Sequence, residues 1–534
     1  MKKLFLISII SGFTLLSCKN KEEEPQQKDV AETKIQQDED FRPNYHFTPE
    51  VNWMNDPNGM FYMNGTYHLF FQYYPDGNKW GPMHWGHATS KDMVVWEEQP
   101  IALKPDEKGY IFSGSAVVDK NNSSGFGDGK TPPVIAMFTY HDPEGEKAGR
   151  KDYQSQAIAY SLDEGKTWTK YKENPVIKNP GLKDFRDPKI TWDEAHKQWL
   201  MVLSADDRTI FYTSQNLKDW QKASEFGMGL GAHNGVWECP DFFPMKVEGS
   251  NETKWVLIQS LNPGGYNGGS GTQYFVGDFD GKKFSVIKEM KDLPGDHSYW
   301  IDYGKDNYAG VTWSNIPESD GRKLFMGWMS NWLYAQEVPT ETWRSAMTIA
   351  RELKLKKDEK AGYRIFSSPV KELDKYFGEA TGTKNTQAKA GQNIIENKDL
   401  DLAKARIGFS IDSLQDRTYE FSLNNPEGDT LRFGYDHTQK QFYVNRKKSG
   451  ITDFGENFAS PVSTAPRTSE ADNLPVEIFL DKTSIEIFYD NGETVMTEIF
   501  FPTRPYKSFT AGKGEDFSIK NLKTSKFDIP ENQK

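Results

Sequence analysis

A degenerate unit that recurs along the chain restricts the folds open to it. Each copy reads as a strand, a tight polar turn and a second strand closed by an aromatic residue. Units of this kind, repeated every ~50 to 70 residues, are typical of the blades of a β-propeller. Four visible copies allow five blades. The copies run from His87 to Trp96, from Ala159 to Trp168, from Tyr212 to Trp220 and, more loosely, from Val276 to Phe284.

The pattern of short strands divides the chain into two domains. With 534 residues, the chain is too long for one compact core. Residues 44–369 hold short aromatic and β-branched runs between Gly, Asn, Asp and Pro, which predicts the catalytic propeller. Residues 370–380 carry Val370, Leu373 and Phe377 on one helical face and are expected to form a linker. From residue 381 to 534, runs such as Arg406–Ile411 alternate apolar and polar residues, as in a β-sandwich. The predicted fold class is therefore all-β, a five-bladed β-propeller followed by a C-terminal β-sandwich.

The first residues predict export and lipidation. Two lysines precede an apolar run, Leu4–Leu16, that is too short to span a membrane. Leu15-Leu16-Ser17-Cys18 resembles a bacterial lipobox, so residues 1–18 are interpreted as a lipoprotein signal peptide with Cys18 as the lipidated residue. A plain signal peptide with an incidental cysteine is the alternative. Residues 19–43 are polar and are expected to form a flexible tether. The expected location is the bacterial outer membrane, at the cell surface or on the periplasmic face, with the membrane bound through this anchor.

Composition narrows the partners. The net charge is -12, which predicts no basic surface for nucleic acid and favours a neutral substrate. Aromatic residues make up 14% of the chain, with 15 Trp, and sugar rings are common partners of exposed aromatic side chains. The same residues could equally fill a large core. Cys18 and Cys239 are the two cysteines, so a processed chain has no disulfide framework.

Three carboxylates stand in aromatic segments that contain proline and so differ from solvated surface acids. Asp56 lies in Trp53-Met54-Asn55-Asp56-Pro57-Asn58-Gly59, Asp187 in Phe185-Arg186-Asp187-Pro188, and Glu238 in Trp237-Glu238-Cys239-Pro240-Asp241. Each alone could be a turn residue, an ion-pair partner or a loop cap. Together they match a propeller in which successive blades send a carboxylate to the axis. Glycoside hydrolysis needs such groups, one to protonate the leaving oxygen and one to attack or stabilise the sugar carbon.

These motifs, in this order, resemble glycoside hydrolase family 32, the fructan hydrolases and invertases. The likeness extends through Phe112-Ser113-Gly114-Ser115, Gly327–Trp332 and Leu480–Phe488. It implies a five-bladed propeller followed by a β-sandwich, and retaining cleavage of β-linked fructose. It also implies that Asp56 is the nucleophile, Glu238 the general acid and base, and Asp187 a stabiliser of the transition state. For retention, the two working carboxyl groups should lie about 5 to 5.5 Å apart.

The resemblance further implies a set of substrate contacts around the terminal fructosyl unit. Phe112 and Trp328 could instead pack between blades. Cys239 is expected to be a buried packing residue rather than a nucleophile, because no motif pairs it with a histidine. The expected contacts are Trp53, Asn55, Gln72, Trp80, Phe112, Ser113, Arg186, Trp328 and Trp332.

No cofactor and no metal are expected. His84 and His87 have a spacing that invites a metal site, but no third ligand matches and the chemistry requires no metal.

Several alternatives remain at this stage. A propeller glycosidase of the arabinan or xylan type would invert configuration and lacks the motif around Asp56. A fructan-binding surface lipoprotein with an inactive site would not need all three carboxylates. Asp56 before Pro57, together with the tract from Gly264 to Gly271, favours an exo-acting enzyme that releases fructose from levan or inulin and also from sucrose. An endo-acting levanase or inulinase is the alternative within the family.

Overall fold

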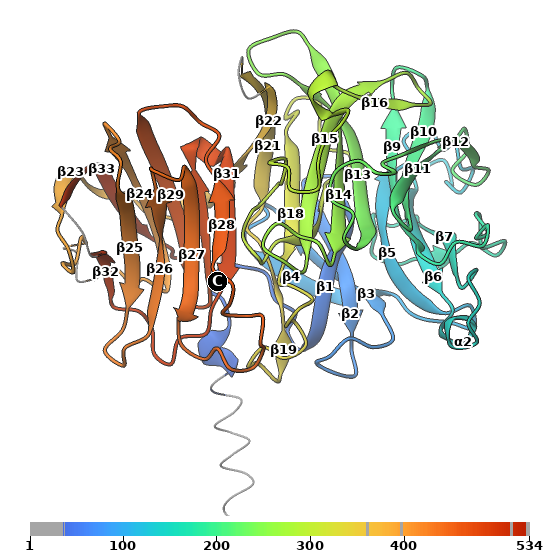
Figure 1. Ribbon diagram of the computed structural model, residues 1–534. Coiled ribbons are helices and arrows are strands. Elements are labelled where there is room, and N and C mark those ends of the chain that lie inside the picture. The colour runs from blue at the N-terminus through green and yellow to red at the C-terminus, as the bar shows by residue number, and fades with distance from the viewer. Residues whose placement is uncertain (1–35, 37, 359–361, 396–398, 513–515, 530–534) are drawn as a thin grey trace, which may run out of the picture.

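The computed structural model describes residues 36, 38–358, 362–395, 399–512 and 516–529. Two β-domains lie side by side, the first drawn in blue to yellow and the second in orange to red (Figure 1). The predicted signal peptide, Cys18 and most of the predicted tether lie outside the described residues. Among the described helices, none combines the length and apolar character needed to cross a bilayer.

The described strands of the first domain form five sheets. Each sheet holds at least four strands joined mainly by antiparallel pairing. The first comprises β19 (Trp343–Arg344), β1 (Asn52–Met63), β2 (Thr66–Tyr74), β3 (His84–Ser90) and β4 (Trp96–Leu103). The second comprises β5 (Tyr110–Val118), β6 (Val134–His141), β7 (Gln154–Ser161) and β8 (Thr169–Lys170), with the short helix α2 (Pro143–Lys147) between β6 and β7.

The remaining three sheets of this domain follow in chain order. The third comprises β9 (Phe185–Asp193), β10 (Gln198–Ala205), β11 (Arg208–Ser214) and β12 (Gln221–Phe226). The fourth comprises β13 (Val236–Lys246), β14 (Thr253–Asn262), β15 (Gly271–Phe279) and β16 (Phe284–Val286), followed by the 3-10 helix η1 (Lys288–Met290). The fifth comprises β17 (Tyr308–Thr312), β18 (Lys323–Met329), β20 (Ala346–Met347), β21 (Arg351–Asp358) and β22 (Gly362–Pro369).

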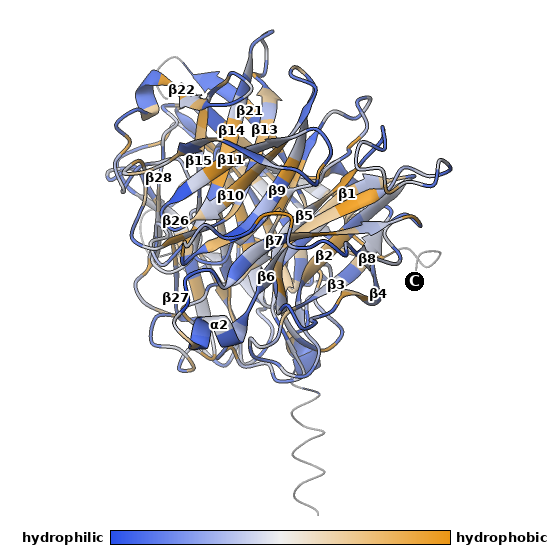
Figure 2. Ribbon diagram, turned by 90° about the vertical axis from the view of Figure 1, so that its right-hand side faces the viewer, coloured by the Kyte–Doolittle hydropathy of each residue, from blue (hydrophilic) through white to orange (hydrophobic). Residues whose placement is uncertain are grey.

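The first strand of each sheet faces the centre of the domain. Strand β1 contacts β5, β5 contacts β9, β9 contacts β13, β13 contacts β17, and β17 returns to β1. This closed ring of strands is the inner surface of a propeller. Hydrophobic residues gather along the strands and polar residues in the loops (Figure 2). The prediction of an all-β chain with a propeller followed by a sandwich is confirmed.

The recurring sequence unit marks the turn between the third and fourth strands of a sheet. In three copies, a serine at the end of the third strand accepts hydrogen bonds from backbone N–H groups of the turn. Ser90, Ser161 and Ser214 do so over distances of 2.8 to 3.3 Å. Such short side-chain to backbone bonds favour a turn over continued pairing. The repeat is thus a local device that ends one strand and starts the next.

The second domain is a pair of packed sheets. The 3-10 helix η2 (Lys371–Lys375) precedes it. Leu373 within η2 is buried, as are the flanking Val370 and Phe377, the three residues predicted to share one face of the linker. One sheet comprises β23 (Thr381–Ala388), β33 (Phe517–Lys526), β24 (Lys404–Asp412), β29 (Asn473–Asp481), β30 (Ser484–Tyr489) and β31 (Thr494–Ile499), with the 3-10 helix η3 (Asp490–Gly492) after β30. The other comprises β28 (Ser463–Pro466), β27 (Gln441–Lys448), β26 (Thr430–Asp436), β25 (Thr418–Asn424) and β32 (Ser508–Ala511).

Phenylalanines from both sheets meet between them. The Phe409 ring on β24 lies 5.0 Å from the Phe421 ring on β25, and Phe421 stacks on Phe509 at 5.4 Å. On β24 every second residue is buried, as the alternating sequence predicted. This arrangement is the core of a β-sandwich.

Buried charges join the two domains. Arg351 of the propeller pairs with Glu486 of the sandwich and, at 2.8 Å, with Asp302. Arg446 of the sandwich pairs with Asp306 of the propeller at 2.6 Å. All of these side chains are nearly inaccessible to solvent. Because a buried charge left unpaired is costly, the network fixes one arrangement of the domains.

The end of the predicted tether is ordered and packed, which corrects the expectation of flexibility up to residue 43. The Asp38 carboxylate accepts hydrogen bonds from the backbone of Glu341 and Thr342, and Phe41 is buried. Residue His46 lies between Asp481 and Glu486 of the sandwich, at 2.8 and 2.9 Å. The polar composition of the segment does not show these contacts, because they are made with residues far along the chain.

Candidate active site

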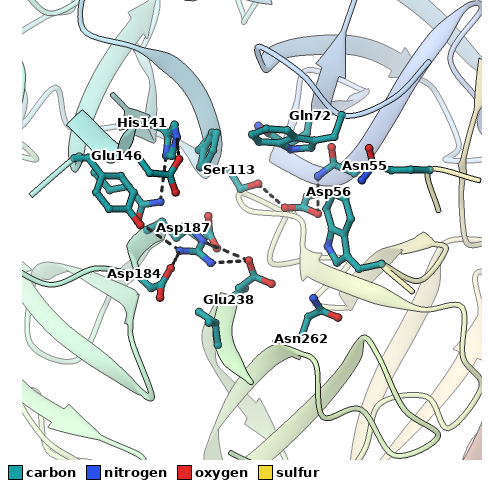
Figure 3. A pocket seen from close by; sticks show the side chains of 18 residues that line it. Asn55, Asp56, Gln72, Ser113, His141, Glu146, Asp184, Asp187, Glu238 and Asn262 are labelled. Atoms are coloured by element: carbon teal, nitrogen blue, oxygen red, sulfur yellow. Dashed lines mark hydrogen bonds and ion pairs between the residues drawn. The ribbon is translucent and has the colours of Figure 1, made fainter. Parts of the chain in front are cut away.

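A pocket of about 400 Å³ opens where the inner strands of the propeller begin. Asp56 lies near the start of β1, Ser113 of β5, Asp187 of β9 and Glu238 of β13. Figure 3 shows the three carboxylates around one space, with Asp56 on the side of Gln72 and Asn55, and Glu238 on the side of Asp184. The structure therefore brings together the three predicted catalytic residues.

Each inner strand is irregular at its site residue. The pairing register shifts between Met54 and Pro57, between Ile111 and Gly114, between Glu238 and Asp241, between Tyr308 and Val311, and opposite Asp187. Such β-bulges re-aim side chains and are common beside active sites. Pro57, Pro188 and Pro240 lie at three of them, where a missing N–H costs no ladder bond. The prolines of the sequence motifs thus mark the places where side chains turn into the pocket.

Asp56 is held by neutral donors, and the two shortest of these hydrogen bonds come from Ser113 and Asn55. Ser113 Oγ donates to its Oδ2 at 2.7 Å and Asn55 Nδ2 donates to its Oδ1 at 3.0 Å. Burial raises the pKa of Asp56, and the nearby Glu238 adds to this, while the Ser113 hydrogen bond opposes it. No cation is paired with this carboxylate in the described structure. An oriented carboxylate without a counter-ion is suited to attack a carbon atom.

Asp187 is buried and adopts an unusual backbone conformation. Its φ is +67°, a region rarely taken by residues other than glycine. Its Oδ2 accepts a 3.0 Å hydrogen bond from the Cys239 backbone N–H. Burial raises the pKa of Asp187 to about 7. The positive charge of Arg186 opposes this rise, and the negative charges of Glu238 and Asp56 add to it. The three acids are therefore electrostatically coupled.

Glu238 contacts two further polar side chains. Arg186 Nη2 donates to its Oε1 at 2.9 Å, and the Tyr308 hydroxyl donates to its Oε2. Its backbone carbonyl accepts a 2.8 Å hydrogen bond from Gln259 Nε2. The side chain is 20% exposed, so it can reach both the pocket and solvent water. A general acid and base needs access of this kind.

Cys239 packs beneath the carboxylates. Its Sγ lies 3.5 Å from Asp56 Oδ2 and 3.6 Å from Asp187 Oδ2. Burial, together with these two acids and Glu238, raises the pKa of the thiol well above its usual value. The thiol therefore stays protonated and is a poor nucleophile, in agreement with its expected packing role.

The predicted substrate contacts divide into two groups. Seven line the pocket: Asn55, Gln72, Trp80, Phe112, Ser113, Arg186 and Trp332. Trp53 and Trp328 do not, and both are fully buried, which corrects their assignment as contacts. Their rings lie 5.7 and 5.0 Å from the ring of Trp332. They therefore support the pocket wall from behind.

Other lining residues were not predicted from the sequence. Tyr308 was also missed, because a tyrosine at the start of an apolar strand resembles a core residue. Asp184 stands two positions before Arg186, and that spacing was the one local signal. The missed lining residues are His141, Glu146, Tyr153, Gln154, Asp184, Val236, Asn262 and Gln336.

The two histidines weighed as metal ligands have other contacts. His87 is buried and stacks on Phe70 at 4.1 Å, and His84 Nδ1 lies 2.9 Å from the Pro82 carbonyl oxygen. Within the described residues, no three His, Cys, Asp or Glu side chains are grouped so that they could hold a metal ion.

Comparison with known proteins settles the family. The N-terminal domain model of glycosyl hydrolases family 32 matches residues 46–369, and the C-terminal model matches residues 372–526. This chain belongs to glycosyl hydrolase family 32. The resemblance seen in the sequence motifs is thus confirmed, and the chain is a glycoside hydrolase.

Relatives and solved structures extend the likeness over most of the chain. The levanase of Bacillus subtilis (strain 168) is 50% identical over 472 residues, covering 88% of this chain and 68% of that protein. An extracellular exo-inulinase of Aspergillus ficuum is 42% identical over 502 residues, covering 87% and 90%. The crystal structure of exo-inulinase from Aspergillus awamori has a TM-score of 0.83 at 37% identity, covering 92% of this chain and 98% of that chain.

Proposed function

We propose that this family 32 enzyme hydrolyses β-linked fructans, levan or inulin, with sucrose as a further substrate, and that it retains the anomeric configuration. The observation that carries the proposal is the meeting of Asp56, Asp187 and Glu238 in one pocket walled by aromatic and amide side chains. The similarity to a levanase and to exo-inulinases supports the choice of substrate.

In the first step, the Asp56 carboxylate attacks C2 of the terminal fructosyl unit. The bond from C2 to the bridging oxygen breaks, and Glu238 gives its proton to that oxygen. Ser113 and Asn55 hold Asp56 in the attacking orientation. Asp187 binds hydroxyl groups of the ring and supports the positive charge that develops at C2.

In the second step, Glu238 acts as a base. It removes a proton from a water molecule, whose oxygen attacks C2 and displaces Asp56. Fructose leaves with the configuration of the substrate, because two inversions have occurred. Proton NMR of the first product formed tests this step. The β-anomer should appear first, and initial appearance of the α-anomer would contradict the proposed roles.

We further propose exo attack, with release of single fructose units from chain ends. The compact pocket at the propeller axis supports this, because Trp80, Phe112 and Trp332 wall a space suited to one terminal unit. Size-exclusion chromatography of digested levan provides the test. Exo attack predicts that fructose accumulates while most of the polymer keeps its size, whereas an early fall in polymer size would favour the endo alternative.

Finally, we propose that a lipid on Cys18 anchors the enzyme to the bacterial outer membrane. The support is the sequence from Lys2 to Cys18, and Cys18 lies outside the described residues. Fractionation of cells that express Cys18→Ala should recover soluble, active enzyme. Retention of that variant in the membrane fraction would contradict the proposal.

A further inference from the structure

Asp184 lies at the rim of the pocket, just before β9, and has no role in the mechanism above. We infer that Asp184 is a positioning residue for the general acid, acting through Arg186. The inference rests on the proposed function, in which Glu238 is that acid.

The Arg186 guanidinium lies between two carboxylates. Its Nη1 donates to Asp184 Oδ1 at 2.6 Å, while Nη2 and Nε donate to Glu238 Oε1 at 2.9 and 3.3 Å. A guanidinium is planar and its donors have fixed directions, so an anchor on one edge sets the direction of the other. Asp184 therefore fixes the edge that faces Glu238. Both Arg186 and Asp184 are largely buried, at 12% and 15% side-chain exposure, which limits alternative positions.

A two-residue turn holds Asp184 in place. Asp206, in the turn between β10 and β11, donates its backbone N–H to the Asp184 carbonyl at 2.8 Å. Its side chain accepts from the Asp184 N–H at 3.3 Å. The Asp206 carbonyl accepts from the N–H of Trp237, the residue before Glu238, at 3.1 Å. The same turn thus connects the start of β9 to the start of β13. The contacts form a closed ring that runs from Asp184 through Arg186 to Glu238 and back through Asp206.

The Asp184 carboxylate also offsets part of the positive charge of Arg186. The charged groups that act on Arg186 are the carboxylates of Asp184, Asp187 and Glu238, and His141 and Tyr153 also interact with it. Removal of the Asp184 charge leaves more of the guanidinium charge acting on Glu238. The alkaline limb of the kcat/KM profile should then move to lower pH, because a nearby positive charge favours the ionised form of a carboxyl group.

The test compares Asp184→Asn with Asp207→Asn, a matched control. Asp207 neighbours Asp206 in the same turn but pairs with Arg208, is 48% exposed and does not line the pocket. For Asp184→Asn, kcat on inulin should fall about tenfold. The alkaline limb of kcat/KM should shift down by about one pH unit. Asp184→Glu, which keeps the charge, should return the limb to its native position, and Asp207→Asn should match the native profile.

Different results would overturn the role of Asp184 and the proposed function. An unchanged limb in Asp184→Asn, with or without loss of kcat, would overturn the inference, because a merely structural role reduces activity without moving the limb. A limb that stays displaced in Asp184→Glu would overturn it as well. Absence of fructan cleavage by the native protein would instead overturn the proposed function, and this inference with it.

Discussion

At the scale of single residues, the three carboxylates share one pocket but differ in their partners. Asp56 has neutral hydrogen-bond donors, Glu238 has Arg186 and a tyrosine hydroxyl, and Asp187 is anchored by a backbone N–H. Asp56, the proposed nucleophile, is the residue whose loss should cost the most activity with the least damage to the fold.

Replacement of Asp56 by Asn keeps both hydrogen-bonding neighbours but removes the attacking oxygen. We expect kcat on levan to fall about a thousandfold or more. The circular dichroism spectrum should be unchanged. Asp278→Asn, at an exposed residue paired with Lys254, should keep native activity and serves as the control. Activity of Asp56→Asn within tenfold of native would contradict its role.

The ionised Asp187 carboxylate should lower the free energy of unfolding at neutral and alkaline pH. Its pKa is about 7 in the fold because of burial, above the usual 3.8, so ionisation favours the unfolded chain. The protonated Asp187 contributes its full stability to the folded protein below pH 4, and this contribution to the free energy of unfolding is lost as the pH rises through 7. Asp187→Asn should be inactive, because the proposed stabiliser of the transition state is lost. Its melting temperature relative to that of the native protein should rise between pH 5 and pH 8, because the native protein alone loses stability over that range. A constant difference across that range would contradict the assigned ionisation.

At the scale of elements, part of the arrangement was readable from the sequence. The recurring turns and the alternation on β24 are local signals, and each predicted its element. The prolines marked the segments of the three carboxylates, but the β-bulges beside them were found only in the structure. Trp53 and Trp328 were misassigned because exposure depends on neighbours far along the chain. Tyr308 was missed because the fold, and not local sequence, brings it to Glu238, 70 residues away in the chain. Asp184 was missed although it stands two positions before Arg186, because that spacing does not by itself show which way either side chain points.

The segment before β1 provides a pH-dependent contact with β29 and β30. Burial alone would lower the pKa of His46, but hydrogen bonds to Asp481 and Glu486 raise it to about 9. The protonated His46 therefore adds about 3 kcal/mol to the free energy of unfolding. This contribution is fully present below pH 6.5 and is lost as the pH rises through 9.

His46→Gln should therefore melt below native at pH 6. The gap between the two melting temperatures should narrow between pH 7 and pH 10, because the native protein loses its charged histidine. Melting curves by differential scanning calorimetry provide the measurement. A gap that stays constant with pH would show that His46 is neutral in the folded protein.

At the scale of the whole molecule, the propeller and the sandwich share a hydrophobic core. One continuous cluster includes Leu353 and Leu355 of the propeller and Ile485 and Ile487 of the sandwich. With the buried pairs of Arg351 and Arg446, this interface is unlike the polar contacts of domains that move independently.

We expect the two domains to unfold together in one calorimetric transition. Arg351→Ala leaves Asp302 without its cation and Glu486 with His46 alone, and should destabilise the protein by about 3 to 5 kcal/mol. The transition should move to lower temperature and remain single. Two separated transitions in this variant would show that the domains are stable independently.

A timed separation of products from levan, inulin and sucrose, with the native enzyme and Asp56→Asn in parallel, tests the proposed function most directly. We expect fructose as the one early product from the fructans with the native enzyme, and no product above background with the variant. Early oligosaccharides would contradict exo attack, and equal fructose release by Asp56→Asn would contradict the assigned active site.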